Sequence, residues 1–351
     1  MKIIKACLQS AAIVTMLAAS VPAFAQLHDH FVIDYTDLER YDQALDAIEA
    51  GADPEATFLD YYSGGGTGIK LWLGRADATP ERAAAFMARR VGGQPDWARM
   101  PYGYAATLKQ HEDTLRSYYS RLQELFPDNT GPILPTYFVV AVLNGSGSWA
   151  LTGNYVTIGA FSAKPGKSLS DIKPGVDITE IIDLEIDPAV VLQAAVHEMV
   201  HYYQMIYQGQ PGYLAMYRDE ARDTNMARAV REGVADFIAD LAIAGDLSEL
   251  VSVQARAEYF YENEAIIWAL FEPVAEDLNN DDNGWFYGVH PEKPEMPFQI
   301  GYSLGREMAR AYYDQAEDKT EAIRFLLSAN DAAAHGAILD AYRRDRADEN
   351  L

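Results

Sequence analysis

Helical spacing of apolar residues dominates the first third of the chain. Residues 28–62 read as short helices, and residues 103–125 carry a long amphipathic pattern. Between them, Thr79 is a suitable cap for a helix over residues 80–93, which begins with proline and ends with two glycines. The pattern therefore predicts a series of helices before the first clear strand.

The only clear β pattern lies in the middle of the chain. Residues 137–143 are continuously apolar and rich in β-branched and aromatic residues. A second short run, Tyr155–Ile158, follows after a Gly/Ser turn. From about residue 188 to the end the pattern is helical again. The order of helices, a small sheet and then helices, without βαβ alternation, predicts an α+β fold that is mainly helical.

The start of the chain has the three zones of an export signal in the right order. Two lysines precede an apolar segment at residues 11–19, and residues 23–25 (Ala-Phe-Ala) form a small-residue cleavage site. We expect residues 1–25 to be a signal peptide, cleaved after Ala25, and the mature protein to be secreted or periplasmic. No later segment has the uninterrupted apolar length of a membrane span, so no membrane association is expected after cleavage.

The charge balance narrows the classes of partner. The chain has 351 residues, with 52 Asp and Glu against 28 Lys and Arg, and a formal net charge of -24. Nucleic acid and anionic membrane surfaces both need a basic face, so neither is expected as a partner. The one cysteine, Cys7, lies in the expected signal peptide. The mature protein therefore offers no cysteine ligand to a metal ion and forms no disulfide.

Residues 197–201 read His-Glu-Met-Val-His, the H-E-x-x-H pattern. Asp187 is a suitable N-cap and Pro188 fits the first helical position, so a helix should begin just upstream. On a helix, His197 and His201 leave one face about one turn apart, which lets two ring nitrogens meet one metal ion.

Glu198 has a different place on the same helix. It lies roughly 100° round the helix from its neighbour His197, beside the metal ion rather than on it. There it can take a proton from a metal-bound water and later deliver it to a leaving amine. Two histidines with an interposed glutamate favour zinc, although iron on two histidines and a carboxylate stays open.

The third ligand must be a histidine or a carboxylate, and Glu232 is the best candidate. It lies on a predicted helix of about 224–244 and shares a face with Asp236, which can accept the free N–H of a ligating histidine and fix its tautomer. Gly233, in the middle of this helix, costs about 1 kcal/mol relative to alanine. A close approach of this helix to the one that carries His197 and His201 would explain why a glycine stands there. The alternative for Glu232 is a surface pair with Arg228.

This ligand set resembles that of the gluzincin metallopeptidases. The resemblance covers about residues 135–315, and the sequences Glu-Gly-Val-Ala-Asp-Phe (232–237) and Ile-Gly-Tyr-Ser-Leu-Gly (300–305) look closer to bacterial families described only as predicted zinc-dependent proteases. It implies a Zn2+ ion held by two histidines and a glutamate, with the motif glutamate as general base. It also implies a zincin-like catalytic domain, assigned here to residues 131–351, with a small sheet packed on the motif helix. Residues 26–130 form an N-terminal helical region without a resemblance of this kind.

Two further roles remain for a zinc peptidase. The tetrahedral oxyanion needs a donor, for which Tyr302, followed by a helical pattern and preceded by glycine as in the related families, is the first choice and His290 the second. Either could instead be structural. Zincins also hold the substrate backbone against an edge strand, and Tyr155–Ile158 is the best candidate. Arg306 could meet a substrate carboxylate, but a structural salt bridge is the stronger interpretation.

Three other sequences look like binding motifs. His-Asp-His at 28–30 lies near the expected mature N-terminus, where chains are usually mobile. Residues 279–284 resemble a calcium loop but lack its first Asp and its final Glu, so a polar turn is favoured. The glycine-rich stretch 64–68 predicts a flexible loop, because Ile69 breaks the dinucleotide fingerprint.

The sequence therefore predicts an exported zinc-dependent peptidase that acts on a peptide or protein substrate. The alternative is a catalytically inactive, zinc-binding peptidase-like fold that serves as an exported binding protein, since ligands alone do not prove turnover. A di-iron helical protein is disfavoured, because such a protein needs a second E-x-x-H and the chain has none. Cleavage specificity and oligomeric state stay open.

Overall fold

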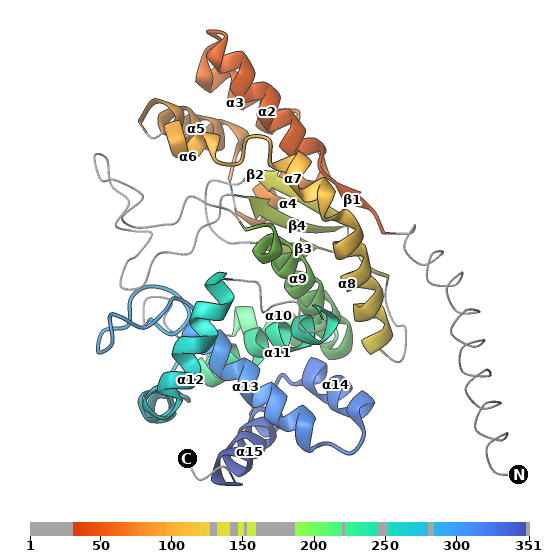
Figure 1. The fold of residues 1–351 in the computed structure, drawn as a ribbon, viewed down its shortest axis with the longest axis vertical. Coiled ribbons are helices and arrows are strands. Elements are labelled where there is room, and N and C mark those ends of the chain that lie inside the picture. Colours follow the sequence, from red (N-terminus) through yellow and green to blue (C-terminus); the bar gives the residue numbers. More distant parts are fainter. Residues whose placement is uncertain are drawn as a thin grey trace, which may run out of the picture.

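The computed structural model describes residues 31–76, 78–93, 95–126, 132–140, 147–150, 153–158, 187–219, 222–243, 251–279 and 284–348. The expected signal peptide, the sequence at 28–30 and positions 280–283 of the calcium-like loop lie outside these ranges. The described part is mainly helical with one small sheet, as an α+β fold requires (Figure 1). None of its helices is both long and apolar enough to cross a membrane.

Helices make up both ends of the molecule. Those before the main part of the sheet are α2 (Thr36–Glu49), α3 (Pro54–Ser63), α4 (Thr67–Arg75), α5 (Pro80–Gly93), α6 (Pro95–Arg99), α7 (Tyr104–Gln110) and α8 (Glu112–Leu125). Those after it are α9 (Pro188–Gln208), α10 (Gln210–Arg218), α11 (Asn225–Ile243), α12 (Val251–Phe271), the 3-10 turn η6 (Glu272–Val274), α13 (Ile300–Gln315), α14 (Lys319–Ser328) and α15 (Ala332–Asp348). Helix α5 has the predicted bounds, whereas the pattern at 103–125 forms two helices that meet at His111.

The sheet has four strands in the order β1-β2-β4-β3. Strands β1 (Ile33–Asp34), β2 (Thr136–Val140) and β4 (Gly153–Ile158) are parallel, and β3 (Gly147–Ala150) is antiparallel to β4. The prediction of a simple Gly/Ser turn between two strands was wrong, because part of that segment forms β3.

Two further strand predictions need correction. Tyr155–Ile158 is not an edge strand, since β4 is hydrogen-bonded to β2 on one side and to β3 on the other. Strand β1 was not predicted at all. It lies in the N-terminal helical region and pairs with β2 through Ile33 and Thr136, so this region contributes a strand to the sheet.

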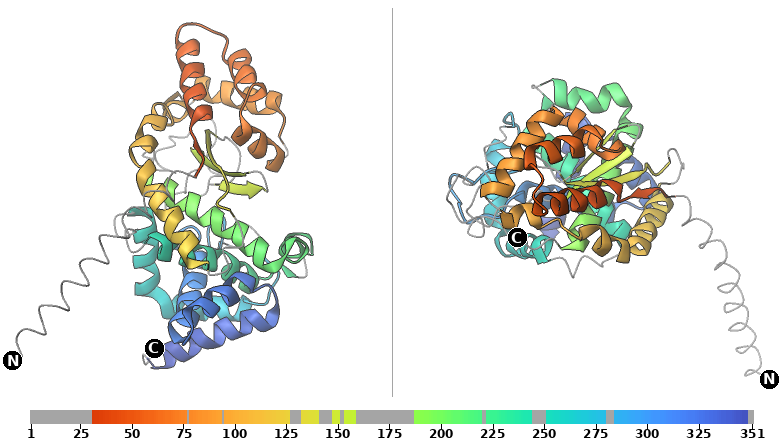
Figure 2. Two further views of the ribbon diagram at one scale, coloured as in Figure 1. Left: turned by 90° about the vertical axis from the view of Figure 1, so that its right-hand side faces the viewer. Right: turned by 90° about the horizontal axis from the view of Figure 1, so that it is seen from above.

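The sheet carries the motif helix on one of its sides. Helix α9 contacts both β3 and β4, and helices α2 and α4 contact β2. The side-chain amide of Asn154 in β4 donates a hydrogen bond of 3.0 Å to the carbonyl of Ala195 in α9. Because Asn154 is fully buried, this bond fixes the motif helix on the sheet two residues before His197. Figure 2 shows α2, α3, α5 and α6 at one end of the molecule, the sheet and α9 in the middle, and α11–α15 at the other end.

Only part of the glycine-rich stretch 64–68, predicted as a flexible loop, is a loop: residues 64–66 connect α3 to α4, and Thr67 and Gly68 begin α4. The carboxylate of Asp37, from α2, accepts hydrogen bonds from the backbone N–H of Gly66 at 2.8 Å and of Ile69 at 3.2 Å. An anion is stabilised at a helix N-terminus, and here the chain supplies its own. A Cβ on Gly68 would lie 2.7 Å from the Cβ of Tyr137, so glycine also lets α4 approach β2.

Helices α11 and α13 touch through their backbones. A Cβ on Gly233 would lie 2.0 Å from the carbonyl carbon of Gly305, and one on Gly305 would lie 1.8 Å from the carbonyl oxygen of Ala229. Gly233 therefore does allow a close approach, but to α13 rather than to the motif helix as expected. Tyr302 lies one turn before Gly305, so this contact brings Tyr302 close to the helix that carries Glu232.

Candidate metal centre

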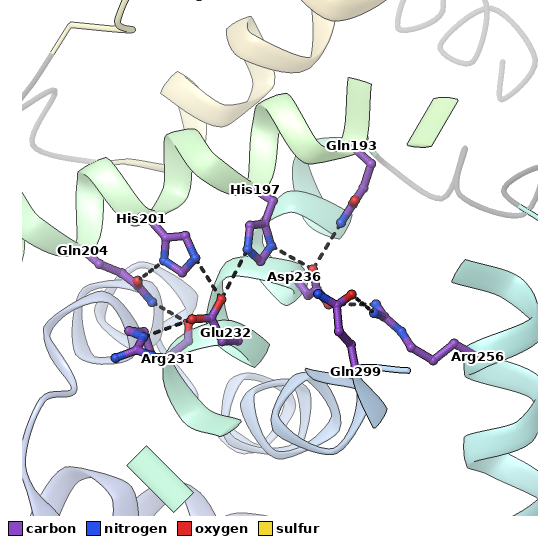
Figure 3. Close-up of polar contacts among 9 residues, drawn as sticks. All are labelled: Gln193, His197, His201, Gln204, Arg231, Glu232, Asp236, Arg256 and Gln299. Carbon is purple, nitrogen blue, oxygen red and sulfur yellow. Dashed lines mark hydrogen bonds and ion pairs between the residues drawn. The ribbon is translucent and has the colours of Figure 1, made fainter. Parts of the chain in front are cut away.

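Three buried side chains from two helices converge at one point. His197 and His201 come from α9 and Glu232 from α11, and one ligand atom of each lies within 4.8 Å of the others (Figure 3). The three residues are 8%, 5% and 8% exposed. Within the described ranges this is the one group of three or more such residues that could hold a metal ion. The structure therefore brings together the three ligands predicted from the sequence.

Local features of α9 explain the position of the two histidines. The side chain of Asp187 accepts a hydrogen bond from the backbone N–H of Ala189 at 2.9 Å, and Pro188 occupies the first turn, as predicted. One turn of helix separates His197 from His201, and their ring centroids lie 4.6 Å apart with the planes at 88°. Both rings consequently face α11.

The spacing of the ligand atoms fits a single ion. Glu232 Oε2 lies 3.0 Å from His201 Nε2 and 3.5 Å from His197 Nε2. A tetrahedral ion with bonds of about 2.0–2.1 Å sets its ligand atoms about 3.3–3.4 Å apart. The two distances to Glu232 are close to this value, and all three ligand atoms lie within 4.8 Å of one another, so two imidazole nitrogens and one carboxylate oxygen could bind one divalent ion.

Each histidine is held through its other ring nitrogen. His197 Nδ1 lies 2.8 Å from Asp236 Oδ1, and His201 Nδ1 lies 2.7 Å from Gln204 Oε1. The Gln204 amide is itself oriented, because its Nε2 donates to the carbonyl of Arg231 at 2.9 Å. These bonds place a proton on Nδ1 of each histidine and direct Nε2 to the centre. Asp236 was predicted from its spacing to Glu232.

Sequence reasoning missed the other supporting residues. Gln204 follows His201 by three positions on the same helix, so helical spacing could have found it.

Three further side chains hold the two carboxylates of the site. Arg231 is 3% exposed, and its Nε donates to the second oxygen of Glu232 at 3.1 Å. Gln193 donates to Asp236 Oδ1 at 3.1 Å, and Arg256 donates to Asp236 Oδ2 at 3.0 Å. Arg256 lies on a separate helix, α12, and no spacing in the sequence points to it.

The charges of the site stabilise one another. Burial alone would raise the pKa of Glu232, but His201, His197 and Arg231 outweigh it and hold the pKa well below its usual range. Burial also opposes ionisation of Asp236, yet His197 and Arg256 lower its pKa to about 2. Burial would lower the pKa of His197, whereas hydrogen bonds to Asp236 and Glu232 raise it to about 10. Both carboxylates are therefore ionised at neutral pH, which suits them to a cationic partner.

Glu198 lies beside the three ligands. Its side chain is only partly buried, and its carboxylate has no hydrogen-bond partner among the described residues. Burial, with help from the negative charge of Glu232, raises its pKa, and the two histidines and Arg75 oppose that shift. A carboxylate with a raised pKa next to a candidate metal site is suited to accept a proton from water.

The two predicted oxyanion donors lie in different surroundings. The ring of Tyr302 stacks on that of His197, with the centroids 6.0 Å apart. Its hydroxyl shares a hydrogen bond with Tyr287, a residue that the sequence did not suggest and that is 38% exposed. His290, by contrast, packs against the ring of Trp285 at 4.8 Å and accepts from the backbone N–H of Glu292 at 3.3 Å. The tyrosine thus lies beside the three ligands, and His290 has no contact with them.

Two alternatives raised by the sequence are also resolved. Arg306 forms ion pairs with Asp240 at 3.3 Å and with Glu307 at 3.4 Å, so the salt-bridge interpretation holds. Arg228 pairs with Asp223 at 2.7 Å and not with Glu232.

Comparison with protein-family models, curated proteins and solved structures finds no match for this chain. The case for its function therefore rests on the residues of the site.

Proposed function

We propose that the protein is an exported zinc-dependent peptidase in which Glu198 is the general base. One observation carries the proposal: a buried group of two histidines and a glutamate, with ligand atoms within 4.8 Å of one another, lies beside Glu198, whose carboxylate has no hydrogen-bond partner among the described residues. This is the donor set of catalytic zinc sites, which keep a fourth position for water or substrate.

The residues of the chain divide the chemistry among them. His197, His201 and Glu232 hold the ion, which when bound supplies Lewis acidity toward water and a peptide carbonyl. Glu198 accepts the proton of the attacking water and passes it to the leaving amine. Zinc is preferred because two imidazole nitrogens and one carboxylate oxygen are a ligand set that catalytic zinc sites use.

The oxyanion that forms at the peptide carbonyl needs a hydrogen-bond donor, and we assign this role to the hydroxyl pair of Tyr302 and Tyr287. Burial raises the pKa of Tyr302 well above its usual range, so the phenol stays protonated and can donate. The kcat of the Tyr302→Phe variant measures this contribution.

The test is a peptide-library digest of the purified mature protein, with and without a chelator, together with metal analysis. We expect one bound zinc per chain and cleavage that the chelator stops. The Glu198→Gln variant should keep the zinc and lose about 10²–10⁴-fold in rate, the usual contribution of a general base.

The matched control is Glu55→Gln, an exposed glutamate at the start of α3, at the opposite end of the molecule from α11–α15. It should cleave at the wild-type rate. An active Glu198→Gln variant would rule out this mechanism. One bound zinc without any cleavage would favour the alternative, a catalytically inactive peptidase-like fold that serves as an exported binding protein.

A further inference from the structure

Arg256 links three parts of the molecule at the edge of the metal centre. Its side chain, from α12, is 12% exposed. It donates to Asp236 Oδ2 on α11 at 3.0 Å and to Gln299 Oε1 at the start of α13 at 3.3 Å (Figure 3). Its guanidinium also lies over the ring of Tyr302, 5.8 Å from the centroid. A planar cation with several fixed donors can hold all three partners at once.

The contact with Asp236 completes the surroundings of a buried carboxylate. One oxygen, Oδ1, accepts from Gln193 and from His197, and the other, Oδ2, accepts from Arg256. Asp236 is 4% exposed, and a charged group at that depth is stable only when it is paired and hydrogen-bonded. Arg256 is the only cation that forms an ion pair with it among the described residues, apart from the histidine that it orients.

The contacts on the other side fix Arg256 itself. Gln299 caps α13 with a φ of 61°, and it is the only non-glycine residue with positive φ in the described part of the chain. Its backbone carbonyl accepts from the N–H of Tyr302 at 3.0 Å. The guanidinium is thus held between the side chain of Gln299 and the ring face of Tyr302, which limits where it can direct its bond to Asp236.

We infer that Arg256 is a positioning residue for the metal ligand His197, acting through Asp236. The guanidinium fixes the carboxylate, and the carboxylate fixes the ring and the Nδ1 proton of His197. The inference rests on the metal centre of the proposed function, but not on peptide hydrolysis. It adds a third helix, α12, to the two that supply the ligands.

Zinc affinity of the folded protein tests this inference, measured by competition with a chromophoric chelator at constant pH. Loss of a group that orients a ligand through hydrogen bonds typically weakens metal affinity about 10–100-fold. We expect Arg256→Met to weaken zinc binding about tenfold and Asp236→Asn to weaken it as much or more. Arg256→Lys, which keeps the charge, should restore part of the loss.

The double variant Asp236→Asn/Arg256→Met separates positioning from a general structural role. If Arg256 acts through Asp236, the double variant binds zinc no more weakly than Asp236→Asn alone. The matched control is Arg346→Met on α15. The side chain of Arg346 is also 12% exposed, and the substitution removes its ion pair of 2.7 Å with Glu264, which is not part of the candidate metal centre. It should leave zinc affinity unchanged.

Two results would overturn the inference: wild-type zinc affinity in Arg256→Met, or losses in the two single variants that simply add. If Arg256→Met does not fold, the comparison of Arg256→Lys with wild type and of the double variant with Asp236→Asn decides the question. A wild-type protein that binds no zinc would instead refute the metal centre. Normal zinc binding and cleavage, with an unaffected Arg256→Met, would refute only the role of Arg256.

Discussion

Two equally buried aspartates show how differently the two ends of the molecule use charge. Asp37, at the start of α2, and Asp236, on α11, are both 4% exposed. Asp37 accepts from the backbone N–H groups of Gly66 and Ile69, with Arg40 at 3.4 Å. Asp236 accepts from three side chains on two other helices: Gln193, His197 and Arg256. Both carboxylates are satisfied, but by different kinds of partner.

The difference separates a structural role from a functional one. Backbone amides at a helix start neither ligate a metal ion nor exchange a proton at ordinary pH, so Asp37 can only fix α4 against α2. An imidazole can do both, and its orientation depends on the group bound to its second nitrogen. Burial alone therefore does not mark a site. The chemistry of the partners does.

The largest loss of stability should come from replacing the glycines at which helices pack closely against their neighbours in each region. Alanine at Gly233 would place a Cβ 2.0 Å from backbone atoms of Gly305, which cannot move without separating α11 from α13. We expect Gly233→Ala to lower the free energy of unfolding by more than about 3 kcal/mol, the upper range for overpacking. Gly68→Ala, which meets side-chain atoms at 2.7 Å, should cost about 1–3 kcal/mol.

Urea unfolding measures both changes, and Gly336→Ala is the control. Gly336 lies inside α15 with open space around its Cα, so alanine there should stabilise the protein by up to about 1 kcal/mol. If Gly233→Ala were as stable as wild type, the close contact between α11 and α13 would not exist as described.

A second buried histidine, His335, provides a contrast with His197, whose ring is hydrogen-bonded to Asp236. His335, on α15, is 7% exposed, and its Nε2 has no hydrogen-bond partner in the described part of the chain. Burial lowers its pKa to about 4; the negative charge of Asp331 opposes this shift and the positive charge of Arg231 adds to it. In the unfolded chain the pKa of histidine is about 6.5.

The sign of the pH effect follows from these two values. Above pH 6.5 the ring is neutral in both states, and as the pH falls toward 4 only the unfolded chain takes up the proton. Wild type should therefore lose roughly 3 kcal/mol more stability than His335→Gln between pH 7 and pH 4. Urea unfolding at both pH values measures the difference. Parallel losses in the two proteins would show that His335 is not held neutral by burial.

The sequence predicted those parts of the site that are encoded locally. The cap at Asp187, the proline after it and the two histidines one turn apart all depend on residues within a single helix. Glu232 and Asp236 likewise share one helix, so their spacing pointed both to a third candidate ligand and to the residue that bonds to His197.

Features that depend on contacts between distant segments could not be predicted in the same way. Strand β1 has only two residues and exists because β2 pairs with it. Strand β3 lies in a Gly/Ser-rich segment whose composition indicates a turn. The partner of Gly233 turned out to be Gly305 on α13, and Arg256 reaches Asp236 from α12. Periodicity describes the face of a helix, but not which element packs against that face.

The smallest expected effect is also the most direct test of the comparison between the two aspartates. Asp37→Asn keeps one acceptor oxygen but turns an N–H donor toward one of the two backbone N–H groups. Leaving one buried donor without an acceptor should cost about 1–3 kcal/mol of unfolding free energy and should not change zinc affinity. Asp236→Asn should instead weaken zinc binding about 10–100-fold, equivalent to about 1.4–2.7 kcal/mol. Both variants are measured by urea unfolding and by chelator competition. If the partners of each carboxylate determine its role, Asp37→Asn lowers stability without changing zinc affinity, whereas Asp236→Asn weakens zinc binding. If Asp37→Asn weakened zinc binding as much as Asp236→Asn, Asp37 would also affect the metal centre, and the distinction between a structural and a functional aspartate would be wrong.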